Sequence, residues 1–229
     1  TGTTTLVTSA NDATITLDNT SNAFTGAVTI TTNDASGTDA DVTIDGGTTA
    51  LDIAASTIDG DLTLTSGHAS GITDSGTVTV GGNFSATTDA NNGVINMGSM
   101  AVDGTVALAT NGNGAATIVN DAGLNFAAST VTGALTATAT TGNITDSGNL
   151  AITGAAVFTT GATGSNIELD SSGNAFAAQV TMQADDGSEA FGNIAFVDSA
   201  AIDFATSAGS NGDLYINAGT DGAVGGNLS

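Results

Sequence analysis

The sequence predicts an all-β protein, a parallel β-helix (β-solenoid) of about 9–10 coils with ~24 residues in each coil, built from three sequence repeats. Three observations support this prediction. Short apolar–polar–apolar triplets recur along the chain, the segments between them are rich in Gly, Asn, Asp and Ser, and longer phrases return with a long, regular period. We expect residues 1–229 to form a single domain of this kind.

The triplets have the period-two pattern of a strand with one buried face. Ile15-Thr16-Leu17, Val42-Thr43-Ile44 and Val78-Thr79-Val80 are examples, and strand-like segments follow one another every ~11 residues on average. The Gly, Asn, Asp and Ser residues between them accommodate turns and left-handed backbone. No segment keeps a helical period, and 32 Gly residues argue against helices.

The long-period repeat favours a solenoid over a sandwich, because a solenoid stacks similar coils on one another. "LDNTSNAFTGAVTI" at 17–30 returns as "LDSSGNAFAAQVTM" at 169–182, and "ITDSG" at 72–76 returns at 144–148. The predicted units are approximately 2–81, 82–153 and 154–225, with 226–229 beginning a fourth. We interpret "ITDSG" as a strand end and corner, needed once per unit at the same angular position.

The charge of the chain excludes some functions. With no Lys or Arg and 23 acidic residues, the formal net charge is −23, so the surface has no cation to neutralise nucleic-acid phosphates. Binding to anionic membrane surfaces is disfavoured for the same reason. No apolar run is long enough for a membrane span, and the absence of Cys excludes disulfides and thiol chemistry. We therefore expect neither a nucleic-acid partner nor membrane insertion.

The phrases "GNITDSGNLAIT", "IELDSSGNAF" and "LDNTSNAFTGAVTIT" resemble the repeat regions of large bacterial exoproteins, the filamentous-haemagglutinin-like group secreted by two-partner systems. The resemblance extends over the whole chain. It implies a right-handed parallel β-helix, an extracellular location and an adhesive or structural role.

The sequence does not predict catalytic residues. His68 lies in a Gly- and Ser-rich turn near Ser70 and Asp74, but "GHASG" is not the nucleophile elbow of a hydrolase. The pairs Asp39/Asp41 and Asp59/Asp61 could supply the two carboxylates of a polysaccharide-cleaving enzyme. Such sites also use aromatic platforms, and the chain has no Trp and a single Tyr. We predict that the protein is not an enzyme.

Calcium is the metal that the acidic loops fit best, since hard cations bind several carboxylate and carbonyl oxygens. The candidate ligands are Asp39, Asp41, Asp185, Asp186 and Glu189. Neither cluster has the spacing of a known calcium loop, and solvated acidic loops are the main interpretation. The sequence therefore predicts no cofactor, with calcium as the open alternative.

The predicted function is structural. We expect a protein that a bacterium secretes and that is extracellular or at the cell surface. It would serve as a segment or protomer of a structural or adhesive fibre. Its partner is itself, by end-to-end stacking or by covalent continuation of the repeats, together with matrix glycans. A calcium- or glycan-binding adhesin module is the alternative. A polysaccharide-active enzyme and an ice-binding solenoid, the latter suggested by pairs such as Thr63/Thr65 and Thr136/Thr138, are less favoured.

Overall fold

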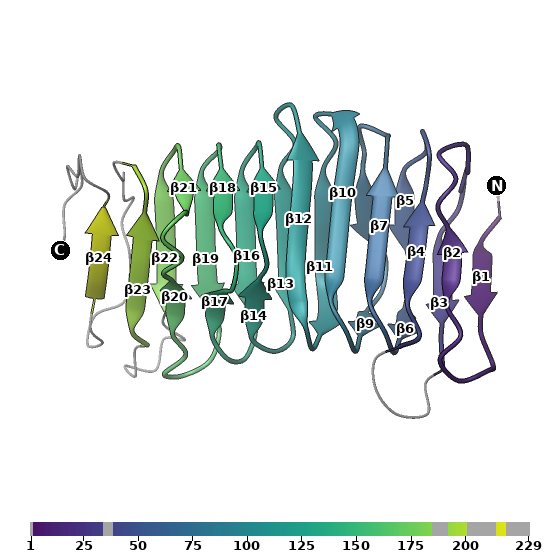
Figure 1. The fold of residues 1–229 in the computed structure, drawn as a ribbon, viewed down its shortest axis with the longest axis horizontal. Coiled ribbons are helices and arrows are strands. Elements are labelled where there is room, and N and C mark those ends of the chain that lie inside the picture. Colours follow the sequence, from purple (N-terminus) through teal and green to yellow (C-terminus); the bar gives the residue numbers. More distant parts are fainter. Residues whose placement is uncertain (1, 34–38, 185–191, 201–213, 219–229) are drawn as a thin grey trace.

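The computed structural model describes residues 2–33, 39–184, 192–200 and 214–218. Strands stack side by side along the long axis, from β1 near the N-terminus to β24 at the opposite end (Figure 1). All secondary structure in the described residues is strand, and every strand pairing is parallel. The predicted all-β, parallel β-solenoid fold is confirmed.

The chain alternates between two sheets as it winds. Sheet A contains β1 (Thr4–Val7), β3 (Val28–Thr31), β5 (Leu51–Ile53), β6 (Ser56–Ile58), β8 (Ile72–Asp74), β9 (Val78–Val80), β11 (Ile95–Val102), β13 (Ala116–Asn120), β16 (Leu135–Ala139), β19 (Ala156–Thr160) and β22 (Val180–Ala184). Sheet B contains β2 (Ile15–Leu17), β4 (Val42–Asp45), β7 (Leu62–Ser66), β10 (Phe84–Asn91), β12 (Thr105–Asn111), β14 (Leu124–Phe126), β15 (Ser129–Val131), β17 (Ile144–Asp146), β18 (Leu150–Ile152), β20 (Ile167–Leu169), β21 (Ala175–Phe176), β23 (Ile194–Asp198) and β24 (Leu214–Ala218).

The coils in the middle of the rod are shorter than the sequence predicted. Val42 pairs with Leu62, Leu62 with Phe84, and Phe84 with Val106, so one turn advances the residue number by only 20 to 22. From β1 to β22, and likewise from β2 to β23, the ladders advance by eight steps, so the described residues make about eight turns. At ~4.8 Å for each step, this part of the rod is about 40 Å long.

Alternating burial explains why these short segments form strands. In β7, Leu62, Leu64 and Ser66 point inward and are buried, whereas Thr63 and Thr65 are partly exposed. The narrow interior is filled mainly by Ile, Val, Leu and Ala, with larger rings at intervals. Phe126, Phe158, Phe176 and Phe196 form a row of successive ring contacts, with centroids 6.2, 6.1 and 5.0 Å apart.

The repeat unit does not return to the same angular position. The first "ITDSG" begins at β8 in sheet A, but the second begins at β17 in sheet B. The chain makes three and a half turns between the two strands, because the coils there are shorter than predicted. Our expectation of one angular position per unit is therefore wrong: each unit is rotated by half a turn, and only alternate units coincide.

The half-turn rotation of each unit also exchanges the strand arrangements of sheets A and B. In the first unit, the half-coil in sheet A is bent and consists of β5 and β6, while β7 in sheet B is a single straight strand. In the second unit, the bent half-coil is β14 and β15 in sheet B, and the straight strand is β16 in sheet A. The long strands β10, β11 and β12 connect the two arrangements.

Candidate functional surfaces

The "ITDSG" corner holds neighbouring coils together through a carboxylate. The Asp74 carboxylate accepts hydrogen bonds from the backbone N–H groups of Gly98 and Ser99, one coil further on, at 2.8 and 2.6 Å. In the second copy, the Asp146 carboxylate accepts from the N–H groups of Asp170 and Ser171 at 3.0 and 3.3 Å. The motif thus has the same structural role on both sides of the rod. Its hydrogen bonds are strong ones, because the acceptor is a charged carboxylate.

A second column of side-chain oxygens runs from coil to coil at the corner before the straight strands. Asp41 Oδ1 accepts from the N–H of Asp61 at 2.8 Å, and Asp61 Oδ1 accepts from the N–H of Asn83 at 2.6 Å. Asn83 Oδ1 then accepts from the N–H of Thr105 at 2.9 Å. This column explains part of the acidity of the loops without a metal, because the carboxylates satisfy backbone donors that the sheets leave unpaired.

Glycines line the same corners and allow the coils to approach closely. The N–H of Gly82 donates to the carbonyl of Gly60, and the N–H of Gly154 donates to the carbonyl of Gly133, each at 3.0 Å. A Cβ atom on Gly82 would lie 2.2 Å from Asp61 Oδ1, and one on Gly154 would lie 2.4 Å from the Gly133 carbonyl carbon. Neither position has room for a side chain.

Sequence analysis missed the polar side chains inside the rod. Ser56 Oγ donates to the Ala54 carbonyl at 2.8 Å and accepts from the Ile30 N–H at 2.9 Å. Ser129 Oγ makes the equivalent bonds in the second unit, to the Ala127 carbonyl and the Leu108 N–H, at 2.9 and 3.0 Å. The repeated phrases "AASTI" and "AASTV" could have indicated them, because each places a serine among inward-pointing apolar residues.

Asn120 and Asp198 occupy one repeat position but differ in how well they are satisfied. Asn120 Oδ1 accepts from the Val102 N–H at 2.8 Å, and its Nδ2 donates to the carbonyls of Val102 and Gly123 at 3.0 and 2.7 Å. Asp198 Oδ1 accepts from the Phe176 N–H at 3.2 Å, but Oδ2 is buried without a hydrogen-bond partner. Burial raises the pKa of Asp198 above its usual value, against the lowering effect of backbone donors.

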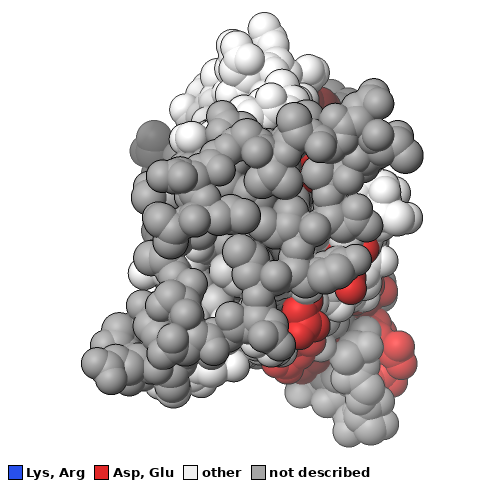
Figure 2. All heavy atoms as spheres, turned by 90° about the vertical axis from the view of Figure 1, so that its left-hand side faces the viewer, with Lys and Arg blue, Asp and Glu red and all other residues white. Residues whose placement is uncertain are grey.

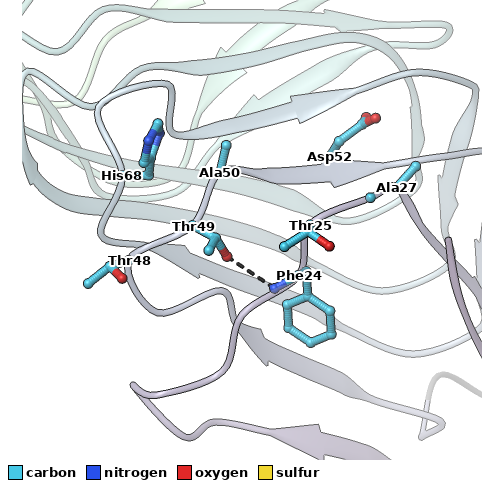
Figure 3. A pocket seen from close by; sticks show the side chains of 9 residues that line it. Phe24, Thr25, Ala27, Thr48, Thr49, Ala50, Asp52 and His68 are labelled. Atoms are coloured by element: carbon cyan, nitrogen blue, oxygen red, sulfur yellow. Dashed lines mark hydrogen bonds between the residues drawn. The ribbon is translucent and has the colours of Figure 1, made fainter. Parts of the chain in front are cut away.

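Two hollows lie at equivalent places in the first and second units. One, of about 430 Å³, is lined by Phe24, Thr49, Asp52 and His68 among others (Figure 3). The other, of about 330 Å³, is lined by Asn125 among others, and Asn125 occupies the repeat position of Asp52. In both hollows the Oδ1 atom of this residue is buried without a hydrogen-bond partner. The hollows lie on opposite sheets, as the half-turn rotation requires.

His68 is a turn residue in the structure. It is exposed, and its Nδ1 accepts a hydrogen bond from the backbone N–H of Ser70 at 3.0 Å. Asp74 is engaged with the backbone of Gly98 and Ser99, as described above. The structure therefore gives these residues structural roles at their turns and does not pair His68 with Asp74 in a hydrogen bond.

The calcium candidates are only partly covered by the structure. Asp39 and Asp41 are exposed, and Asp41 already accepts a backbone N–H. Asp185, Asp186 and Glu189 lie outside the described residues. Within the described ranges, no group of three or more His, Cys, Asp or Glu side chains is arranged to hold a metal ion. Calcium binding stays a prediction.

The threonine pairs are divided between the two sheets. Thr16, Thr43 and Thr63 are neighbours in successive coils of sheet B, but the next positions of this column are Ser85 and Ala107. Thr136 and Thr138 are on sheet A. In the part of the chain that the structure describes, the column of Thr16, Thr43 and Thr63 therefore spans three coils only.

Acidic groups are visible in the view onto the β24 end of the rod, mainly toward the lower right of that face (Figure 2). The chain has no Lys or Arg to balance them, so the rod carries charge of one sign. Of the residues that the structure describes, none form a helix long and apolar enough to cross a membrane.

Among the described residues, the strands at the two ends of the rod have pairing partners on one side. In the described part of the chain, β1 pairs with β3 and β2 with β4, and β24 pairs with β23. Leu6, Ile15 and Leu17 point toward the core but are only partly buried, whereas the equivalent inward side chains of inner coils are almost fully buried. The inward apolar side chains of the first described coil are thus less buried than those of the inner coils.

A family model described as repeats of unknown function (DUF5649) matches residues 1–31, 39–109 and 113–183, most of the chain. The chain belongs to this repeat family. The second and third matches are equal in length, and their starting points are separated by nearly the same number of residues as the two "ITDSG" phrases on opposite sheets. No curated protein and no solved structure matches the chain.

Proposed function

We propose that the chain is a segment of an extracellular or cell-surface fibre, with a structural and adhesive role and no enzymatic activity. The observation that carries this proposal is the continuity of the ladders, which run in parallel from one end of the rod to the other. Each inner coil is held by two neighbours through backbone hydrogen bonds and buried apolar side chains, as in other repeat architectures. Such a rod suits a spacer or fibre better than a compact enzyme.

Relationship to the filamentous-haemagglutinin-like exoproteins belongs to the same proposal. It is supported by the repeated phrases and by a repeat family whose units fold as a β-solenoid. The −23 charge fits an exposed surface, since charge of one sign suppresses side-to-side association of sheets. Secretion by a bacterium follows from this relationship.

Localisation tests the proposal directly. Antibodies raised against the purified chain should label intact cells of the source organism or the matrix around them, as seen by immunogold electron microscopy. Antibody to a cytoplasmic protein is the control for cell integrity. Labelling that appears only after lysis would overturn the extracellular assignment.

A glycan is a second candidate partner, favoured by the two equivalent hollows. A sugar could place a ring face against Phe24 and hydroxyl groups near Thr49 and Asp52. On a glycan array, the chain should bind polysaccharides, and Phe24→Ala combined with Asp52→Ala should weaken that binding. Thr130→Ala, on an exposed position of β15, is the control. Equal binding by all three proteins would argue against the hollow as a glycan site.

Calcium binding is the remaining alternative, and the thermal stability of the chain in calcium and in chelator tests it. If Asp39 and Asp41 bind calcium in the folded state, millimolar calcium should raise the melting temperature relative to a chelator. Asp39→Asn with Asp41→Asn should remove that difference, although Asp41→Asn keeps the oxygen that accepts the Asp61 N–H. An unchanged melting temperature in calcium and in chelator would exclude this alternative at those residues.

A further inference from the structure

Asn92, Asn111 and Asn113 are each followed by glycine, and the structure brings them together at one corner of the rod. The N–H of Asn92, in the turn after β10, donates to the carbonyl of Asn111 at the end of β12, at 2.9 Å. The N–H of Asn113 donates to Asn92 Oδ1 at 2.8 Å. An Asn-Gly pair is chemically labile, because glycine has no Cβ to hinder attack of its nitrogen on the asparagine side chain.

The backbone nitrogen of Gly112 lies against the side chain of Asn111. Its N–H donates to Asn111 Oδ1 at 2.7 Å. Because a C=O bond is about 1.23 Å long, this nitrogen is at most about 3.9 Å from Cγ, the carbon that it would attack. Reacting groups held near ~3–3.5 Å are close to an attack geometry. Both residues are exposed, so water and hydroxide reach them.

The glycine nitrogens after Asn92 and Asn113 are held differently. The N–H of Gly93 donates to the Ala90 carbonyl at 3.0 Å, and the N–H of Gly114 donates to the Asn111 carbonyl at 3.1 Å. Both glycines are buried, in contrast to Gly112. Their N–H groups are therefore directed at carbonyl oxygens and shielded from hydroxide, so the three Asn-Gly pairs differ in reactivity although their sequences are alike.

The carbonyl of Asn111 accepts both the N–H of Asn92 and that of Gly114, at 2.9 and 3.1 Å. This carbonyl belongs to the same peptide group as the Gly112 nitrogen. When that nitrogen loses its proton, negative charge moves onto the carbonyl oxygen, and two fixed donors stabilise it as they would an oxyanion. One of these donors comes from the neighbouring coil, so the stacking of coils activates the nitrogen.

The fold also requires glycine at position 112. The φ angle of Gly112 is 69°, and a Cβ atom there would lie 2.0 Å from Asn91 Oδ1. A larger residue would be strained and would clash, so the least hindered nitrogen stays next to Asn111.

We propose that Asn111 is a site of spontaneous deamidation through a succinimide formed with the Gly112 nitrogen. Hydroxide takes the Gly112 amide proton, the nitrogen bonds to Asn111 Cγ, and the Cγ–Nδ2 bond breaks as Nδ2 takes a proton from water and leaves as ammonia. Water then opens the ring at either carbonyl, which leaves aspartate or isoaspartate at position 111. The inference is independent of the proposed fibre role.

Deamidation would alter the contact between the coils of β10 and β12. Either product adds a negative charge to a chain that has no Lys or Arg to balance it. Isoaspartate also lengthens the backbone by one carbon atom, at the residue whose carbonyl accepts the N–H of Asn92. The reaction thus changes the middle of the rod without any enzyme.

Incubation of the purified, folded chain at mildly alkaline pH tests the proposal, because hydroxide drives the first step. A protease that cleaves at acidic residues would digest it, since trypsin has no site in the chain. Tandem mass spectrometry of peptides 90–103 and 104–121 then resolves Asn92, Asn111 and Asn113. Each deamidation adds about 1 Da, and enzymatic methylation of isoaspartyl groups identifies that product.

In the folded chain, Asn111 should deamidate at least about tenfold faster than Asn92 or Asn113. In concentrated urea the difference should shrink to about twofold or less, because all three precede glycine and have lost their different surroundings. A smaller preference in the folded chain, a preference that persists in urea, or no conversion at Asn111 would overturn the proposal.

Two variants give an independent measurement in peptide 104–121. Asn111→Gln should lower deamidation in this peptide at least about tenfold, because the longer side chain closes a larger ring and lies differently against the Gly112 nitrogen. Asn113→Gln is the matched control and should leave the conversion unchanged. Circular dichroism would show that both variants fold. Equal conversion in Asn111→Gln and the parent chain would exclude Asn111 as the modified residue.

Discussion

Residues 42–80 and residues 116–152 are two copies of one sequence pattern, yet their corresponding strands lie on opposite sheets of the rod. The first copy has its bend in sheet A and its straight strand in sheet B, and the second copy has the reverse. Matching residues in the two copies, or directly after them, nonetheless make similar coil-to-coil contacts: Asp74 matches Asp146, Ser56 matches Ser129 and Gly82 matches Gly154. The difference teaches that the repeated unit contains an odd number of half-coils, so each unit places its strands on the sheet opposite to those of the unit before it.

The largest loss of stability is expected from substitutions at the glycines where neighbouring coils approach most closely. Gly82→Ala and Gly154→Ala should each lower the free energy of unfolding by about 3 kcal/mol or more, because the new Cβ would overlap backbone or carboxylate atoms of the previous coil. Urea titration would measure both. Gly98→Ala is the control, since the nearest atom to its added Cβ is 4.0 Å away. A large loss for one glycine and none for the other would contradict the equivalence of the two sides.

The next effect concerns Asn120 in the second unit and Asp198 in the third, which occupy one repeat position but differ in their hydrogen bonds. Because the folded-state pKa of Asp198 is raised, folding favours its protonated form, and its unfavourable contribution grows as the pH rises from the unfolded value of 3.8 through the folded value. Asp198→Asn should therefore stabilise the protein at neutral pH, by about 1–3 kcal/mol, and the gain should shrink toward pH 4.

Asn120→Asp is the matched reverse change. It should destabilise the rod at neutral pH by about 1–3 kcal/mol, because it removes two donated hydrogen bonds and buries a carboxylate. Thermal unfolding at several pH values would measure both variants. A stabilisation by Asp198→Asn that is independent of pH would show that the charge of Asp198 is not the cause.

A smaller difference in stability is expected between substitutions at the two "ITDSG" corners. Asp74→Ala should cost about 1–2 kcal/mol through the loss of two backbone partners. Asp146→Ala should cost more, since Asp146 Oδ2 also accepts from Asn174 Nδ2 at 2.7 Å. Asp18→Ala, at an exposed acid in the first coil, serves as the control in the same denaturant series. The order would be refuted if Asp74→Ala proved the more damaging change.

The sequence alone predicted the all-β solenoid, because triplets such as Val42-Thr43-Ile44 show inward and outward positions directly. It did not predict the half-turn rotation. The separation of the two "ITDSG" phrases fits three longer coils as well as three and a half shorter ones, and only strand pairs such as Leu62 with Phe84 show the coil length. The roles of Asp74 and Asp146 were hidden for a related reason, because their partners lie 24 or 25 residues away along the chain.

The three-and-a-half-turn unit makes the rod sensitive to odd and even numbers of units. Duplicating one unit within such an array would turn everything beyond it to the opposite flank, whereas duplicating two would restore the original orientation. A flat target lying against one flank would meet only every second copy of any surface feature, such as the hollow beside Asp52, about 34 Å or seven coils apart. Multivalent attachment along one side would thus have twice the spacing of the repeat, while a ligand able to reach around the rod could engage every unit.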